Sequence, residues 1–336
     1  MSVAIEKDFI EAFLSKHPSS VFECLLSDRT TGKNIIWADA EYAEFGDGYG
    51  GDDEITVEKV TGEMSGLIKP RVAKELERQS SRTKARAEVF TPSWLVNSMN
   101  NALDADWFGR IDAFNAEEAG GWKTNQKRID FPKVEGRGWR DYISSTRLEI
   151  TCGEAPFICS RYDTVTGVPL AVADRIGLLD RKLRVVSERA RTRDTWVKWA
   201  MAALQSTYGY EYQGDNLLIA RINVFETVEE HLRERWSSEL TEGEMAEIAR
   251  IISWNIWQMD GLTCAPPTNA ERVVYRSAFG ELEPEEQQTS LFEGIAGFEE
   301  YEGSGQQSDC VVVSLCIIYD WEKGEPFEFA ALKGGK

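Results

Sequence analysis

The sequence predicts an α/β protein in which helices cover a parallel sheet. Short apolar runs end in turn residues and are followed by segments with helical periodicity, which is typical of strand–helix–strand units. The chain has 336 residues, of which 42% are hydrophobic, so it can bury one large core with additions or two cores. No apolar run reaches the length of about 18 residues that a membrane helix needs, and we expect a cytoplasmic protein.

The N-terminal part is predicted to be helical and mixed. Residues 4–17 have helical periodicity, "KNIIWADAEYAEF" (33–45) resembles a strand, and "GDGYGGDDE" forms a turn or loop. Helix-forming residues follow from residue 69, with Pro70 near the helix start. After Pro92, the apolar residues Leu95, Met99 and Leu103 recur at intervals of four and predict one face of an amphipathic helix.

The central part alternates between strands and helices. "STRLEITCGEAPF" (145–157) predicts a buried strand running into a tight turn, and residues 193–209 predict a helix with Gly209 just past its end. Residues 210–228 predict a short strand, a turn at Gly214 and a helix. Residues 244–262 predict a helix passing into an apolar run that ends at Asp260. A loop over about 277–308 and a last strand pair complete the chain.

Cysteine and histidine usage argues against several kinds of site. Both histidines stand alone in charged helical contexts, which argues against histidine-based triads and histidine-rich metal sites. The cysteines are scattered, none in a CxxC pair, and buried free thiols fit better than disulfides or zinc ligands. They occupy positions Cys24, Cys152, Cys159, Cys264, Cys310 and Cys316.

Charge is distributed unevenly along a chain whose formal net charge is −19. Residues 69–86 hold seven Lys or Arg, residues 181–193 hold a second basic cluster, and residues 277–321 hold none. One interpretation is a set of solvated helix faces followed by an acidic loop. The other is a patch that faces DNA, with an acidic tail turned elsewhere or onto a partner.

Polar residues follow three of the predicted strands, where an open α/β sheet binds its ligands. Glu149 ends the first strand, and Gly153 permits close approach of the backbone to a ligand. Glu211 ends the second strand, with Tyr212 beside it to cover a ring, and Asp260 ends the third. This set suits a nucleoside, because a carboxylate accepts hydrogen bonds from two ribose hydroxyls at once.

Four segments resemble, in their order, the adenine-specific DNA methyltransferases of bacterial restriction-modification systems. They are "EVFTP" with the helix after it, "EITCGEAPF", "YGYEYQGDNLLIARIN" and "IISWNIWQMDGL". The chain is also similar to proteins called restriction endonuclease subunit M through "DRTTGKNIIWA", "SRYDTVTG" and "RIGLLDRKLRVVSE". The resemblance spans roughly residues 25–265. It implies a Rossmann-like S-adenosylmethionine-binding sheet over 86–262, after a helical or mixed segment (1–85) and before an acidic appendage (263–336).

The resemblance also implies roles for individual residues. The methionine end of S-adenosylmethionine would be walled by Phe90, Thr91 and Pro92. Its amino-acid moiety would meet Glu149 and the turn that contains Thr151, Cys152, Gly153 and Phe157. Glu211 would accept both ribose hydroxyls, and Asp260 would accept from the adenine amino group.

The chain departs from the family in two respects. Glu149 and Glu211 are 62 residues apart, far more than usual, so residues 166–186 are an insertion. Its basic residues contact DNA phosphates or form a surface lobe. The family's catalytic motif places Asn, Asp or Ser before Pro-Pro and an aromatic ring after it. The only Pro-Pro, Pro266-Pro267, lies between Ala265 and Thr268, which lack the required acceptor and ring.

The sequence therefore names no catalytic residue. The resemblance leaves two interpretations: a second restriction-modification subunit supplies the catalytic motif, or the chain binds cofactor or DNA without methylating. A metal-dependent nuclease lacks support, because "DWEKG" has its Glu and Lys adjacent, which is the wrong spacing for a metal-binding core. A further alternative is an inactive DNA- or partner-binding protein of phage defence or anti-defence, such as an acidic DNA mimic.

Overall fold

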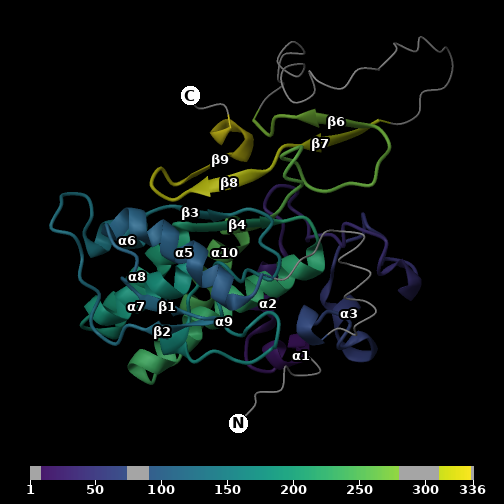
Figure 1. The fold of residues 1–336 in the computed structure, drawn as a ribbon. Helices are drawn as coiled ribbons and strands as arrows, with labels where there is room; N and C mark the ends of the chain where they lie inside the picture. Colours follow the sequence, from purple (N-terminus) through teal and green to yellow (C-terminus); the bar gives the residue numbers. More distant parts are fainter. Residues whose placement is uncertain (1–8, 74–90, 280–309, 334–336) are drawn as a thin grey trace.

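The computed structural model describes residues 9–73, 91–279 and 310–333, and within them the chain has a mixed α/β fold (Figure 1). Its centre is a parallel sheet of three strands in the order β3 (Arg147–Glu149), β4 (Thr207–Glu211) and β5 (Ile256–Gln258). Glu149 pairs with Gly209 and Glu211 pairs with Gln258, so the three carboxyl ends lie at one edge of the sheet. The predicted α/β class and the three central strands are confirmed.

Helices connect these strands and cover one face of the sheet. The chain passes from β3 to β4 through α7 (Leu178–Arg189) and α8 (Arg193–Gln205), and from β4 to β5 through α9 (Gly214–Trp236) and α10 (Glu242–Asn255). Three of these helices match the sequence-based expectation, but Gly209 is not a helix-ending residue. It lies inside β4, where an added Cβ would come within 2.9 Å of the Ile158 side chain.

A short hairpin covers the opposite face of the sheet (Figure 1). It consists of β8 (Ile317–Asp320) and β9 (Glu325–Glu328), followed by the 3₁₀ turn η6 (Phe329–Leu332). Tyr210 and Trp257 of the sheet pack with Ile318 and Phe329 in a second hydrophobic core. The predicted final strand pair is split between two sheets, because β7 (Val311–Ser314) pairs in parallel with β6 (Val273–Arg276).

The N-terminal segment packs on the helical face. α1 (Phe9–Leu14) and α2 (Ser19–Leu26) share the main hydrophobic core with α9 and α10. The segment 33–45 is not the expected strand, although Ile35 and Trp37 are buried. Instead, the side-chain amide of Gln258 in β5 donates to the Ile36 carbonyl at 2.8 Å and accepts from its N–H at 2.9 Å. Short helical turns follow at η1 (Ala43–Phe45), α3 (Val57–Val60), η2 (Gly62–Met64) and η3 (Arg71–Ala73).

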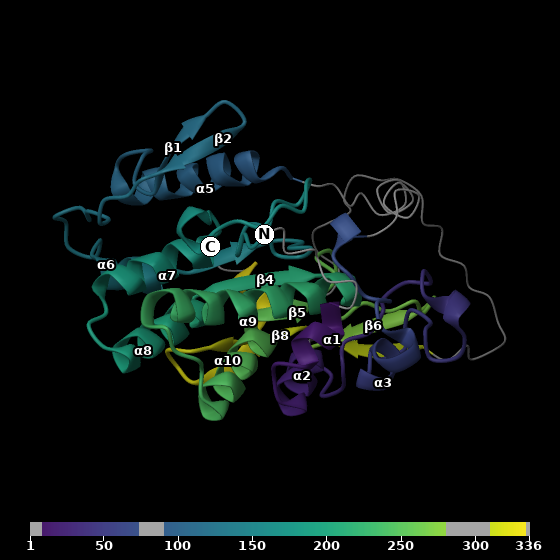
Figure 2. The same cartoon turned by 90° about the horizontal axis from the view of Figure 1, so that it is seen from below.

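Helix α5 (Ser93–Phe108) has its apolar face turned away from the core. The helix is present where the sequence predicts it, but Leu95, Met99 and Leu103 are exposed, the last at 48%. The buried face instead carries polar residues, among them Asn97, Asn100, Asn101 and Asp104. Together with the hairpin β1 (Asn115–Glu118) and β2 (Gly121–Thr124), α5 forms a layer of its own (Figure 2). α6 (Trp139–Ser144) leads from this layer to β3.

The polar face of α5 is buried because Arg181 of α7 satisfies it. The Arg181 guanidinium, 1% exposed, donates to Asp104 at 2.6 Å, to Asn97 at 2.9 Å and to Asn101 at 2.8 Å. Asp104 also accepts from the Tyr142 hydroxyl at 2.9 Å. A buried network of hydrogen bonds of this kind holds two elements in one arrangement.

In the segment 166–186 the residues of the first half are mostly exposed, and the basic residues that follow make internal contacts and do not form a DNA-facing cluster. Arg181 belongs to the network just described, and Lys182 is also 1% exposed. The Lys182 ammonium group donates to the Ser145 carbonyl and the Ser206 hydroxyl, both at 2.7 Å. Burial lowers the pKa of Lys182 well below its usual range. Arg175 pairs with Glu230, so these basic side chains serve internal contacts.

Two further findings concern cysteines and membranes. All six cysteines are free thiols; four of them are buried, Cys24 is partly buried and Cys310 is exposed. Among the described residues, none of the helices combines the length and the apolar composition required to cross a lipid bilayer.

Candidate functional site

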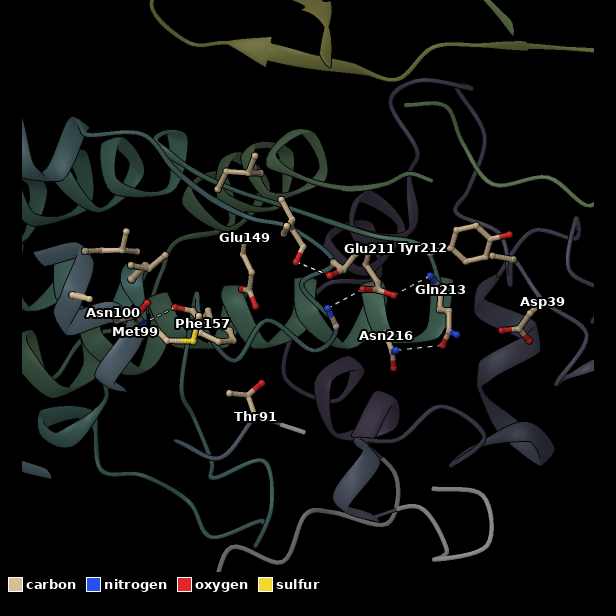
Figure 3. A pocket seen from close by; sticks show the side chains of 18 of the residues that line it. Asp39, Thr91, Met99, Asn100, Glu149, Phe157, Glu211, Tyr212, Gln213 and Asn216 are labelled. Atoms are coloured by element: carbon tan, nitrogen blue, oxygen red, sulfur yellow. Dashed lines mark hydrogen bonds between the residues drawn. The ribbon is translucent and has the colours of Figure 1, made fainter. Parts of the chain in front are cut away.

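A cavity of about 1200 Å³ lies at the carboxyl edge of the sheet. The ends of β3 and β4 form one wall, and α5 forms another (Figure 3). Asn100, Phe157 and Glu149 lie toward one end of the cavity, and Glu211 and Gln213 lie toward the other. Open α/β sheets bind ligands at this edge, because loops and helix starts converge there.

Glu211 is fixed in the cavity wall by backbone groups. Its Oε2 accepts from the Gly153 N–H at 2.8 Å, and its Oε1 accepts from the Gln213 N–H at 3.2 Å (Figure 3). The side chain is 8% exposed. These two bonds hold the carboxylate in one orientation at the end of the strand. Glu211 is therefore a preorganised acceptor at the end of β4.

The turn after β3 has an unusual backbone. Thr151, Gly153 and Ala155 all have positive φ, at 48°, 54° and 65°. Two of the three carry a Cβ, and left-handed conformations of such residues store strain that often marks a functional site. Apart from Gly153 itself and its two chain neighbours, none of the described residues has an atom within 4 Å of the position that a Cβ on Gly153 would take. Gly153 thus serves the left-handed turn and has open space beside it.

Glu149 lies at the end of β3 beside this turn. Its Oε2 is buried and has no hydrogen-bond partner in the part of the chain that the structure describes. Burial raises the pKa of Glu149 well above its usual range, opposed by the Phe157 and Ile158 backbone N–H groups and assisted by the charge of Glu211. The two carboxyl groups at neighbouring strand ends therefore differ in their surroundings: backbone N–H groups bind both oxygens of Glu211, whereas Oε2 of Glu149 has no partner among the described residues.

The first turn of α9 contributes amide groups that the sequence analysis missed. Gln213 and Asn216 line the cavity, and the Asn216 amide donates to the Gln213 side-chain oxygen at 3.3 Å. Both follow Glu211 closely, so the strand–turn–helix pattern is the signal that could have identified them. Asp39 and Asn269 also line the cavity, from segments distant in sequence, and no local pattern indicated them.

The remaining wall is apolar. Met99 and Leu103 of α5 face the cavity, as do Leu148 and Ile150 around the end of β3. These side chains are largely exposed, with Ile150 at 63% and Met99 at 51%. The exposed apolar face of α5 is therefore explained, because its residues Met99 and Leu103 line the cavity.

The cavity brings together seven of the residues that the sequence nominated. They are Thr91, Glu149, Thr151, Gly153, Phe157, Glu211 and Tyr212. Cys152 lines an adjoining pocket of about 110 Å³ that shares Glu149 and Gly153 with the cavity. Pro92 lies at the start of α5, where its carbonyl accepts from the Leu95 N–H at 2.9 Å. Phe90 lies outside the described residues.

Asp260 does not line the cavity. Its Oδ1 accepts from the Leu262 N–H at 2.8 Å, and its backbone forms a bridge with Ala265. The carboxylate thus closes the turn after β5. The Pro266-Pro267 pair that follows is buried. No residue of a methyltransferase catalytic motif is therefore identified within the described part of the chain.

Comparisons with known proteins return no relative. No protein-family model, no curated protein and no solved structure matches the chain.

Proposed function

We propose that the chain is a restriction-modification-type, adenine-specific DNA methyltransferase-like subunit that binds S-adenosylmethionine on a Rossmann-like sheet. The observation that carries this proposal is the cavity at the carboxyl ends of the parallel strands β3 and β4, lined by Glu149, Gly153 and Glu211. These residues come from segments that the family resemblance groups together. S-adenosylmethionine supplies a methyl group, and this chain supplies the groups that hold it.

The polar and aromatic side chains of the cavity fit a nucleoside with an amino-acid tail. Glu211 is positioned to accept two ribose hydroxyls, because its backbone bonds hold the carboxylate at the cavity wall. Tyr212 and Phe157 supply apolar surface for a ring and for the aliphatic chain of the ligand. Asp260 lies outside the cavity, so an adenine amino group would meet other acceptors, of which Asp39 and Asn269 are in place.

The cavity is larger than one cofactor requires. Typical ligand pockets span about 300–1,000 Å³, and this one measures about 1200 Å³. Its apolar half, between α5 and β3, has few groups that form hydrogen bonds. We propose that this half receives the catalytic segment of a second restriction-modification subunit together with the target base of the DNA. The buried Pro266-Pro267 pair supports the proposal that a second subunit supplies the catalytic motif, because the pair in this chain is not available to the cavity.

Calorimetric titration with S-adenosylmethionine tests the cofactor part of the proposal. The intact chain is expected to bind, and Glu211→Ala is expected to lose at least tenfold in affinity, since two hydrogen bonds to a charged acceptor disappear. Glu322→Ala is the matched control, because Glu322 is an exposed carboxylate on the opposite face of the sheet. Absence of binding by the intact chain refutes the proposal and favours an acidic DNA mimic.

A DNA methylation assay tests the partner. Transfer of a methyl group to adenine is expected only when the product of a neighbouring gene is added to the chain. Activity of the chain alone contradicts the proposed split of the catalytic motif. A chain that binds the cofactor and stays inactive with every candidate partner points to a binding protein of phage defence.

A further inference from the structure

A second pocket lies between the central sheet and the hairpin β8–β9 that covers it. Its volume is about 410 Å³, within the range of about 300–1,000 Å³ that is typical of small-molecule sites. The hairpin and η6 form one wall, and the three strands with the ends of α6 and α8 form the other. Among the described residues, five aromatic side chains line it: Tyr208, Trp257, Trp321, Phe327 and Phe329. The proposed function makes no use of this pocket.

Hydrogen bonds and packing hold the aromatic rings in place. The Tyr208 hydroxyl donates to the Tyr319 carbonyl at 3.1 Å, and the Trp321 indole N–H donates to the Asn255 side-chain oxygen at 2.8 Å. Trp257 is only 2% exposed, so its neighbours fix its ring. The aromatic surface is therefore set before a ligand enters, which lowers the entropic cost of binding.

The charged side chains that line the pocket are acidic. They are Asp320 and Glu322 at the turn of the hairpin, and no Lys or Arg is among the described residues of the lining. Asp320 accepts from the backbone N–H groups of Lys323 and Glu322, both at 3.0 Å; these bonds lower its pKa, so it is ionised at neutral pH. Lys323 also pairs with Asp320 at 3.4 Å, but the Lys323 side chain is 71% exposed, and solvent screens such a pair.

The negative charge of the turn reaches the aromatic wall. Burial, assisted by the charges of Asp320 and Glu322, raises the pKa of Tyr208 to about 12. The phenol therefore stays neutral, and its ring keeps the electron-rich face that attracts cations. Aromatic faces and carboxylates favour the same ligand charge, whereas they disfavour a phosphate or a carboxylate ligand.

We propose that this pocket binds a small organic cation with an alkylated ammonium group, of the kind that choline carries. The aromatic rings contact the methyl groups, and the nearby Asp320 carboxylate compensates the positive charge. A neutral hydrocarbon would gain nothing from the carboxylate. The inference goes beyond the proposed function and does not depend on it, because among the described residues the two pockets share only Leu148.

Titration of the intact chain with choline tests this inference, with binding measured by saturation-transfer NMR of the methyl protons. The neutral analogue is dimethylbutanol, in which a tert-butyl group replaces the trimethylammonium group. Choline is expected to bind about fivefold or more tightly than dimethylbutanol, because only the cation gains from the ring faces and the carboxylate. Equal affinities, or no binding of choline, overturn the inference.

Two variants locate the bound cation. Asp320→Asn removes the charge and keeps an acceptor oxygen for the turn, and it is expected to weaken choline binding about threefold or more. Trp321→Leu removes one ring and is expected to weaken it about fivefold or more. The matched controls are Asp47→Asn and Trp94→Leu, because both residues are exposed and neither lines the pocket. Both controls are expected to bind choline like the intact chain.

The two variants differ in their risk to the fold. Trp321 packs against the main hydrophobic core, so the circular dichroism spectrum and urea midpoint of Trp321→Leu are compared with those of the intact chain. Asp320→Asn changes only a surface turn and decides the question if Trp321→Leu unfolds. Choline binding that Asp320→Asn leaves unchanged overturns the inference. The proposed function is decided separately, by titration with S-adenosylmethionine.

Discussion

Replacing Arg181 by Met is the sharpest test of how α5 is held against the rest of the protein. Met retains much of the apolar volume but removes every donor of the guanidinium. The substitution abolishes the hydrogen bonds to Asp104 at 2.6 Å, Asn101 at 2.8 Å, Asn97 at 2.9 Å and the Ile176 carbonyl at 3.0 Å. Because Asp104 is only 2% exposed, its carboxylate is left as a buried charge without its ionic partner.

The expected cost follows from this burial. Breaking a buried ion pair by removing one partner destabilises a protein by about 3–5 kcal/mol, mostly because of the charge left behind. With a urea dependence of about 3 kcal/mol per molar, the unfolding midpoint should fall by roughly 1 M or more. The double variant Arg181→Met/Asp104→Asn should recover part of the loss, since Asn carries no charge and still accepts from the Tyr142 hydroxyl.

Urea unfolding followed by tryptophan fluorescence measures these changes. Arg191→Met is the matched control, because Arg191 is exposed just beyond α7 and its loss should change stability by no more than about 0.5 kcal/mol. S-adenosylmethionine affinity should fall in Arg181→Met, since α5 forms a cavity wall. If Arg181→Met unfolds like the intact chain and instead weakens DNA binding, the buried network is wrong and Arg181 is a surface contact to phosphate.

Three further predictions concern the ligand, the backbone and pH. Glu211→Gln should weaken S-adenosylmethionine binding less than Glu211→Ala, because the amide oxygen still accepts; equal affinities of both variants and the intact chain, by calorimetry, contradict the site. Gly214→Ala should destabilise by about 2 kcal/mol or more in urea, because its Cβ would lie 2.0 Å from the Ile36 carbonyl oxygen, whereas Gly243→Ala, with nothing within 4 Å, should not. Burial opposes the charge on His17, but the hydrogen bond and charge of Glu229 leave its pKa raised above 6.5. The stability difference between the intact chain and His17→Gln should therefore be full below about pH 6.5 and shrink as pH rises through the raised pKa; a constant difference contradicts the pairing.

Local sequence determined the central strands and helices and the residues at the strand ends. Apolar runs followed by turn residues placed Glu149 and Glu211 at the ends of β3 and β4, because strand periodicity and turn chemistry act over a few residues. The parallel pairing then brings these ends to one edge. That much of the candidate site follows from pattern and general topology.

Only the tertiary structure decided which side chains reach the cavity and which face of α5 is buried. The pattern in α5 shows two unlike faces, but Arg181, 77 residues beyond Asp104, satisfies the polar face, and the apolar face is left to line the cavity. Asp260 follows the same sequence rule as Glu211, yet its carboxylate is used by a local turn. Polarity patterns report how residues differ from their neighbours, whereas burial depends on whether a distant segment supplies the matching donors and acceptors.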